Sequence, residues 1–280
     1  MMSVDKRWHA SLAATARWTA AARSEESTWA VGLFNDPWAA ELAGEEGQRW
    51  LSQMTGRTFG TAPMIIRTRY FDDFLQDAVV ERGLRQVVLL AAGLDTRAYR
   101  LEWLAGTRLF ELDQPEVLQY KTDVLAGAGA EPICQRTAIA VDLAEPWGDA
   151  LLSAGFDKHL PAVWLLEGFL YYIFPEQITP ILDRVATLSA PASRLGFDII
   201  NEHTLLSPIT HTWVEMQARQ GAPWIGWLDD PQGFLVERGW EVSLTQPGNP
   251  DANYGRWKLP VIPLDAPDLP HNWYVTATKK

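Results

Sequence analysis

Glycine and acidic side chains stand at the ends of predicted strands, which is where open parallel sheets bind their ligands. The predicted strand Gln86–Ala92 runs into the loop AAGLDTR (91–97), whose Gly93 permits close approach of a nucleotide or an amino-acid moiety to the backbone. Asp113 ends the next strand, 20 residues after Gly93, where a carboxylate can accept hydrogen bonds from two ribose hydroxyls. The pair therefore predicts a nucleoside site.

Each of these residues also has a plainer interpretation. Gly93 alone could simply end a strand, and Asp113 could cap the helix that opens at Pro115. Glu111 shares one side of the strand with Asp113 and could pair with a neighbouring charge, so Asp113, nearer the strand tip, is favoured for the ribose. The loop lacks the second and third glycines of G-x-G-x-x-G, which counts against a dinucleotide.

Two more acidic residues follow the third and fourth predicted strands. Asp142 could accept a hydrogen bond from an adenine amino group while Leu143 walls the ring, although a helix N-cap ahead of Pro146 fits the position equally well. Glu167 lies between apolar residues in LLEGFL (165–170), so its burial requires a positive group such as the α-ammonium of an amino-acid ligand.

Arg67 lies on a predicted helix ahead of the first strand. A guanidinium at this position could clamp a ligand carboxylate through a bidentate pair. The alternative is a solvated ladder of helical charges that Arg67 forms with Asp72 and Asp73.

These residues must be positioned by an alternation of strands and helices. Five runs that are apolar on both faces predict buried parallel strands: Gln86–Ala92, Arg108–Leu112, Arg136–Val141, Ala162–Leu166 and Arg194–Ile200. Helices are predicted around and between them: Met64–Arg82, Pro115–Ala126, Trp147–Ala154 and Pro175–Leu188. The pattern predicts an α/β, Rossmann-like, mostly parallel sheet with helices on both faces.

The flanking segments complete a single predicted domain over residues 1–280, whose core is 61–200. Residues 1–60 are expected to form a helical lid, because Ser11–Gly60 holds helices without strands. Residues 201–230 are expected to form a cap inserted after the fifth strand, with one helical segment around Leu205–Arg219. The remainder, 231–280, predicts a helix and two antiparallel strands that bring the sheet to seven: Pro231–Arg238, Trp240–Thr245 and Trp273–Thr278.

Net charge and cysteine content indicate which classes of partner and metal site to expect. With 24 Lys and Arg against 35 Asp and Glu, the net charge of −11 repels phosphate backbones and anionic headgroups, so neither nucleic acid nor a membrane is expected as a partner. Cys134, the only cysteine, lies in the predicted buried run Ile133–Val141, which excludes an intrachain disulfide and a cysteine-based zinc cluster; no metal is expected. The N-terminus lacks the apolar region of a secretory signal, and a reducing, cytoplasmic setting is expected.

Five segments in order resemble the leucine carboxyl methyltransferase family: RTRYFDDFL (67–75), LLAAGLDTRAYRL (89–101), FELDQPEVLQYK (110–121), AVDLAEPW (140–147) and LLEGFLYYI (165–173). The resemblance covers residues from about 15 to 200, and its AGLDTR and ELDQP blocks are specific to that family among class I methyltransferases. Its bacterial branch includes polyketide O-methyltransferases of the tetracenomycin type. The resemblance implies S-adenosylmethionine as cofactor and S-adenosylhomocysteine as product.

The resemblance also implies roles for single residues. It places Arg67 on the methionine carboxylate, Asp113 on the ribose and Glu167 near the methionine amino group. The expected cofactor contacts are Arg67, Ala91, Gly93, Asp95, Thr96, Asp113, Gln114, Asp142, Leu143 and Glu167. One departure concerns an N-terminal lysine of the eukaryotic members, because Thr15–Ala20 has none; Arg17 or Arg23 could replace it.

The methyl acceptor decides whether a base is needed. A carboxylic acid, with a pKa of about 4, is ionised at neutral pH, whereas a phenol near 10 benefits from a general base. Tyr171, Tyr172 and His203 are the candidate bases, beside His211; both histidines lie in the cap, where an ordinary surface or capping role is the alternative.

Three tryptophans of the cap, Trp213, Trp224 and Trp227, could wall an acceptor pocket, although at least one is expected to pack the cap onto the sheet. The resemblance implies a small, aromatic or polyketide-like molecule that is methylated on a carboxylate or hydroxyl. The alternatives are carboxyl methylation of a protein C-terminus, a nicotinamide-dependent oxidoreductase, and a non-catalytic protein that binds S-adenosylmethionine or S-adenosylhomocysteine and serves as a partner.

Overall fold

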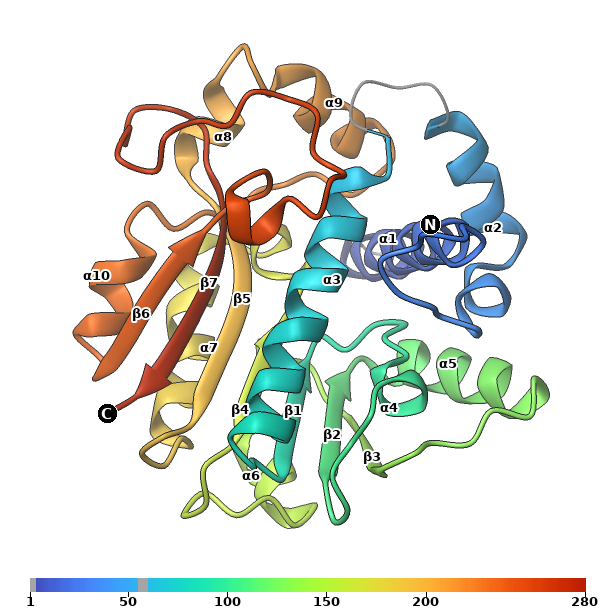
Figure 1. The fold of residues 1–280 in the computed structure, drawn as a ribbon, viewed down its shortest axis with the longest axis vertical. Coiled ribbons are helices and arrows are strands. Elements are labelled where there is room, and N and C mark those ends of the chain that lie inside the picture. Colours follow the sequence, from blue (N-terminus) through green and yellow to red (C-terminus); the bar gives the residue numbers. More distant parts are fainter. Residues whose placement is uncertain (1–3, 55–59) are drawn as a thin grey trace.

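The computed structural model of the protein describes residues 4–54 and 60–280, which form one seven-stranded sheet with helices around it (Figure 1). The strands are β1 Gln86–Leu90, β2 Arg108–Asp113, β3 Gln135–Ala140, β4 Val163–Leu166, β5 Arg194–Ile200, β6 Trp240–Thr245 and β7 Asn272–Lys279. They lie in the order β3-β2-β1-β4-β5-β7-β6. Strands β1 to β5 are parallel, and β7 runs antiparallel to both of its neighbours, β5 and β6. The predicted fold class is confirmed.

Strand β1 is the point at which the order of the sheet reverses. It pairs with β2 on one side and with β4 on the other. The connections that leave its two neighbours therefore diverge, and a crevice opens beyond the carboxyl ends of these strands.

Alternate side chains of the strands enter two separate cores. Val87 and Leu89 face one core, with α3, its π-helical continuation η1, and α4, while Val88 and Leu90 face the other, with α6, α7 and α10. The bounds of these helices are α3 Ala62–Gln76, η1 Asp77–Glu81, α4 Arg97–Arg100, α6 Gly148–Ser153, α7 Pro175–Thr187 and α10 Pro231–Val236. Helices thus cover both faces of the sheet, and they fix the strand tips in space.

The N-terminal helices α1 (Val4–Ser27) and α2 (Ala39–Met54) pack together and contact α5 (Pro115–Gly127) through Leu125. After β5 follow two short helices, α8 (Glu202–Leu206) and α9 (His211–Arg219). Trp50 Nε1 donates a 3.0 Å hydrogen bond to Gln220 Oε1, which joins α2 to the end of α9. The division into lid, core and cap stays a prediction, and residues 1–3 and 55–59 of the predicted lid lie outside the described residues.

Several predicted boundaries differ from the structure for local reasons. Strand β1 ends at Leu90 because Ala91 has a φ of +52°, which strands do not use. The predicted helix Leu205–Arg219 is two helices, because Ser207 is extended ahead of Pro208, which has no N–H to continue the turn.

Two further differences concern α3 and β3. The predicted helix Met64–Arg82 changes to π-helical hydrogen bonding at Asp77. The predicted burial of β3 on both faces is wrong, because β3 is an edge strand and Ile139 is its one buried residue. Just before the strand, Ile133 is exposed and Cys134 is half-buried. Within residues 4–54 and 60–280, no helix has the length and apolar character to cross a membrane.

Candidate cofactor and acceptor site

A cavity of about 1050 Å³ lies at the carboxyl ends of the parallel strands. Four parts of the chain form most of its lining: the N-terminal helices (α1, the end of α2 and the start of α3), the loops after β1 to β4 with the start of α7, the segment 204–225, and the connection 246–272 between β6 and β7. The cavity is therefore placed at the switch point of the sheet, where α/β folds bind their ligands. Sequence reasoning anticipated the first three parts, but not the fourth.

The loop after β1 is bonded directly to the tip of β2. The Gly93 N–H donates to Asp113 Oδ2 at 2.6 Å, and the Gln114 N–H donates to Asp113 Oδ1 at 2.7 Å. Gly93 has a φ of +48°, a conformation that favours glycine. Burial raises the pKa of Asp113 although these two N–H groups stabilise its carboxylate. Asp113 does not cap the helix after it, because Gln114 is the N-cap residue of α5.

Glu111 lies outside the cavity lining. Its fully buried carboxylate is 2.9 Å from Lys121 Nζ and 2.8 Å from Arg136 Nη2. The alternative of a charge pairing with neighbours therefore holds for Glu111, and Asp113 is the acidic residue of β2 that reaches the cavity.

Asp142 and Leu143 lie in the loop after β3, and both line the cavity. Asp142 is exposed, and its Oδ1 accepts a 2.9 Å hydrogen bond from the Ala144 N–H, so it stabilises its own turn. It does not cap α6, whose N-cap is Trp147. Leu143 is buried and presents an apolar surface to the same part of the cavity.

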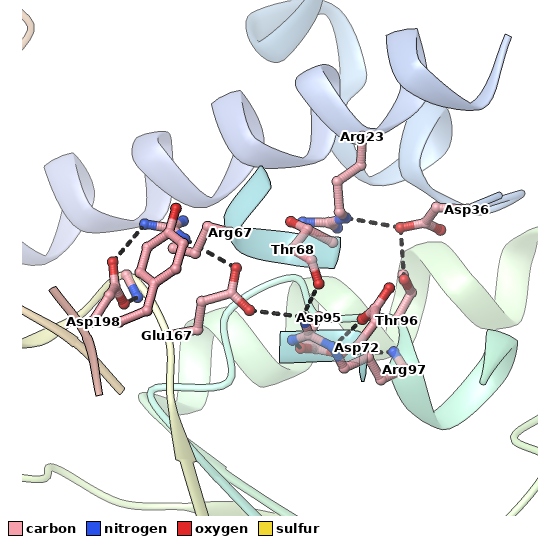
Figure 2. Close-up of polar contacts among 12 residues, drawn as sticks. Arg23, Asp36, Arg67, Thr68, Asp72, Asp95, Thr96, Arg97, Glu167 and Asp198 are labelled. Atoms are coloured by element: carbon pink, nitrogen blue, oxygen red, sulfur yellow. Dashed lines mark hydrogen bonds and ion pairs between the residues drawn. The ribbon is translucent and has the colours of Figure 1, made fainter. Parts of the chain in front are cut away.

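Arg67 and Glu167 contact each other across the cavity floor (Figure 2). Arg67 Nε donates to Glu167 Oε1 at 3.0 Å, and its Nη1 donates to the Tyr171 hydroxyl and, at 3.1 Å, to Asp198 Oδ2. Its Nη2 makes no hydrogen bond to any residue in the described part of the chain. Arg67 is not part of a charge ladder with Asp72 and Asp73, so that alternative is wrong.

Gly168 provides the space for the Arg67 guanidinium. A Cβ at Gly168 would lie 2.9 Å from Arg67 Nη2, and the residue has a φ of +68°. Its N–H donates to Asp198 Oδ1 at 2.6 Å. Asp198, fully buried on β5, thus ties the loop after β4 to Arg67, and burial raises the pKa of its carboxyl although Arg67 lies beside it.

Arg97 extends this group into a network of alternating charges (Figure 2). Its Nη2 lies 2.7 Å from Glu167 Oε2, its Nε bonds Asp72 Oδ1 at 2.6 Å, and its Nη1 bonds Asp95. Burial alone would raise the pKa of Asp95, but Arg97, followed by Lys121 and Arg100, lowers it to about 2. The expected cofactor contact Asp95 therefore has a protein cation as its partner.

The network continues to helix α1. Arg100 pairs with Asp72 at 2.7 Å, and Asp36 Oδ2 accepts from Thr96 Oγ1 at 2.7 Å and from Arg23 Nε at 2.8 Å. Arg23 also donates to the Leu94 carbonyl at 2.7 Å and lines the cavity. Of the two arginines considered as substitutes for lysine, Arg23 is thus at the site. The other, Arg17, pairs with Glu46 outside the cavity lining.

The predicted bases differ in position. Tyr171 and Tyr172 line the cavity, but burial raises the pKa of each hydroxyl, so neither is ionised at neutral pH. His203 is exposed and absent from the lining, because α8 turns it to solvent, which corrects its prediction as a site residue. His211 is also exposed and lies 3.3 Å from Glu215.

The three cap tryptophans divide into two roles. Trp213 and Trp224 line the cavity with ring centroids 6.3 Å apart, and Trp224 lies 4.9 Å from Tyr171. Trp227 packs against the hydrophobic core instead and is not in the lining, so its predicted contact with an acceptor is wrong.

Sequence reasoning missed Arg97, Asp198, Gly168 and the 246–272 connection. Arg97 stands in the AGLDTR block, so its position was visible there. Asp198 lies inside an apolar strand, and an acidic residue within a buried strand is a signal that could have identified it, because such a charge needs a partner.

Comparisons with known proteins identify the family and the fold of the chain. The model of the leucine carboxyl methyltransferase family matches residues 14–186. A Mycolicibacterium paratuberculosis protein, described as a candidate S-adenosyl-L-methionine-dependent methyltransferase, is 36% identical over 90% of this chain and 88% of its own. A similarly described Mycolicibacterium smegmatis protein is 35% identical over 96% and 95%. The crystal structure of a candidate methyltransferase from Thermobifida fusca shares the fold, with a TM-score of 0.59 and 17% identity over 95% and 94%.

Proposed function

Because this chain belongs to the leucine carboxyl methyltransferase family, we propose that it transfers the methyl group of S-adenosylmethionine to an oxygen of a small, largely apolar acceptor. The observation that carries the proposal is the single cavity lining that joins two kinds of surface. One part is polar and lies at the strand tips, around Asp113 and Glu167. The other is aromatic and lies under Trp213 and Trp224.

The polar part fits the cofactor group by group. Asp113 receives the ribose beside the Gly93 backbone, and Asp142 and Leu143 receive the adenine. Arg67 Nη2, which has no partner among the described residues, receives the methionine carboxylate. Glu167 lines the cavity with its two carboxylate oxygens paired to Arg67 and Arg97, and the lone pairs that remain receive the methionine ammonium.

The bound cofactor supplies an activated methyl group on a sulfonium. The chain itself has to orient the acceptor and keep water out. Orientation lowers the entropic part of the activation barrier. Burial keeps Tyr171 and Tyr172 protonated, and both ring nitrogens of the buried His271 already have partners, at Gln246 Oε1 and the Ala266 carbonyl. These surroundings favour an acceptor that is ionised without a base, namely a carboxylate over a hydroxyl.

Binding measurements separate this proposal from a nicotinamide-dependent enzyme. Calorimetry is expected to show binding of S-adenosylhomocysteine and none of NAD. Binding of NAD alone contradicts the proposal.

Labelling then identifies the acceptor. The protein is incubated with methyl-labelled S-adenosylmethionine and an extract of the producing organism, fractionated into small molecules and proteins. We expect label in a small molecule and release by mild base, as for a carboxyl ester. A base-stable label indicates an ether, label on a protein indicates protein carboxyl methylation, and binding without any transfer indicates a non-catalytic partner protein.

A further inference from the structure

Gln217 is a buried amide in the wall of the cavity, and the described residues provide no partner for it. It lies on α9, is 7% exposed, and lines the cavity. Its side chain makes no hydrogen bond to any residue that the structure describes, and Oε1 is shielded from solvent. The amide therefore offers both an acceptor and a donor group for which the described chain provides no complement.

A neighbouring glutamine shows what a structural amide looks like here. Gln220 Oε1 accepts a 3.0 Å hydrogen bond from Trp50 Nε1 and joins the end of α9 to α2. Leaving a buried polar group unsatisfied costs about 1–3 kcal/mol, so a leucine at position 217 would fill the same space more favourably in the free protein. The amide contributes favourably only when a ligand forms hydrogen bonds with it.

The surroundings of Gln217 indicate what kind of ligand this is. Trp213 lies four residues earlier on α9, so the two side chains share one face of the helix, and Trp224 packs against Trp213. The cavity volume of about 1050 Å³ exceeds what single ligands of ordinary size occupy, so space remains beside a cofactor. An aromatic ring system fits between these walls, since aromatic pairs favour offset or edge contacts.

We propose that Gln217 is a specificity-determining residue that hydrogen-bonds an uncharged oxygen, a hydroxyl or a carbonyl, on an aromatic acceptor. The proposal rests on the proposed function, because it assigns the aromatic part of the same cavity to the methyl acceptor. A carboxamide is neutral and can both donate and accept, so it recognises such an oxygen without introducing a charge into an apolar wall.

The test compares two probes that differ by one hydroxyl, 2-naphthol and naphthalene. Their binding to the protein saturated with S-adenosylhomocysteine is measured by calorimetry for the wild type, Gln217→Leu and Gln220→Leu. We expect the wild type to bind 2-naphthol roughly tenfold more tightly than naphthalene, because a site built for a polar group is left unsatisfied by the analogue. Gln217→Leu is expected to bind both probes equally, with an unchanged Kd for naphthalene.

Thermal unfolding separates recognition from structure. Gln217→Leu should keep or raise the Tm, whereas Gln220→Leu should lower it and keep the preference for 2-naphthol. The inference is wrong if the wild type binds 2-naphthol no better than naphthalene, if the preference survives in Gln217→Leu, or if that variant loses stability as Gln220→Leu does. Binding of S-adenosylhomocysteine is measured first. If the protein does not bind it, the proposed function is wrong. If the protein binds it but shows no preference for 2-naphthol, only the assignment of Gln217 is wrong.

Discussion

The Gly93 N–H and the Asp113 carboxylate are joined by a 2.6 Å hydrogen bond, which links the loop after β1 to the tip of β2. One charged side chain thus fixes the glycine loop and also lines the cavity. We propose that the same carboxylate also holds the ribose.

Asp113→Asn should weaken S-adenosylhomocysteine binding by about 10- to 100-fold, since hydrogen bonds to a charged group contribute about 1.5–3 kcal/mol. The Asn side-chain NH2 is a donor, so it cannot accept the hydrogen bond from one of the two backbone N–H groups, of Gly93 and Gln114, that Asp113 now accepts. Calorimetry below the Tm of the variant measures the effect, with Asp149→Asn, an exposed residue outside the lining, as control. An unchanged Kd contradicts the role of Asp113.

Gly168→Ala should disturb Arg67 as well as the backbone. The added methyl would stand 2.9 Å from Arg67 Nη2, and we expect at least a tenfold loss of S-adenosylhomocysteine affinity, measured by calorimetry. Gly129→Ala is the matched control, because Gly129 has a φ of +72° and open space around it, against +68° at Gly168. Gly129→Ala should lower the free energy of unfolding by about 1–2 kcal/mol through its backbone conformation alone. It should leave the affinity for S-adenosylhomocysteine unchanged. Equal affinities of the two variants would sink the explanation.

The ion pair of Asp95 and Arg97 should make stability depend on acid. The pKa of Asp95 is about 2 in the folded protein, below the ordinary value of 3.8, so its stabilisation is present above pH 3.8 and is lost as pH falls through 2. The shift corresponds to about 2 kcal/mol at neutral pH.

Urea unfolding of the wild type and Asp95→Asn from pH 7 to pH 3 tests this dependence. The difference in unfolding free energy should shrink by about 1 kcal/mol between pH 6 and pH 3. Asp183→Asn, at a half-exposed surface pair, is the control. A difference that stays constant with pH contradicts the assignment.

Trp224→Ala and Trp227→Ala should separate acceptor use from packing. Trp224 lines the cavity, so its loss should raise the KM for the acceptor identified by labelling and leave the Kd of S-adenosylhomocysteine unchanged. Trp227 packs on the core, so its loss should lower the unfolding free energy by about 2 kcal/mol or more and leave that KM unchanged. The opposite pattern of KM values refutes the division.

The sheet was predictable because buried parallel strands are apolar runs, and because their carboxyl ends must meet at one edge. That rule brought Gly93, Asp113 and Glu167 together correctly. The ion network was not predictable from local sequence, since Arg67 and Asp198 are 131 residues apart and their contact depends on how α3 lies across β5.

The aromatic side of the cavity was harder to predict for the same reason. Which of Trp213, Trp224 and Trp227 faces a cavity depends on the break at Pro208 and on the path of the chain after α9. The contribution of 246–272 came from a connection without regular periodicity, in which no spacing distinguishes a wall residue from a turn.

Much of the proposed acceptor wall lies in stretches of the chain separate from the proposed cofactor contacts. All residues proposed for the cofactor precede position 186, whereas Trp213 and Trp224 lie in 204–225 and a further part of the wall lies in 246–272. These two segments, 204–225 and 246–272, are called the acceptor cassettes. They can therefore change during evolution without altering the proposed cofactor contacts. A chimera that keeps the first 200 residues and takes both cassettes from a relative should acquire that relative's acceptor.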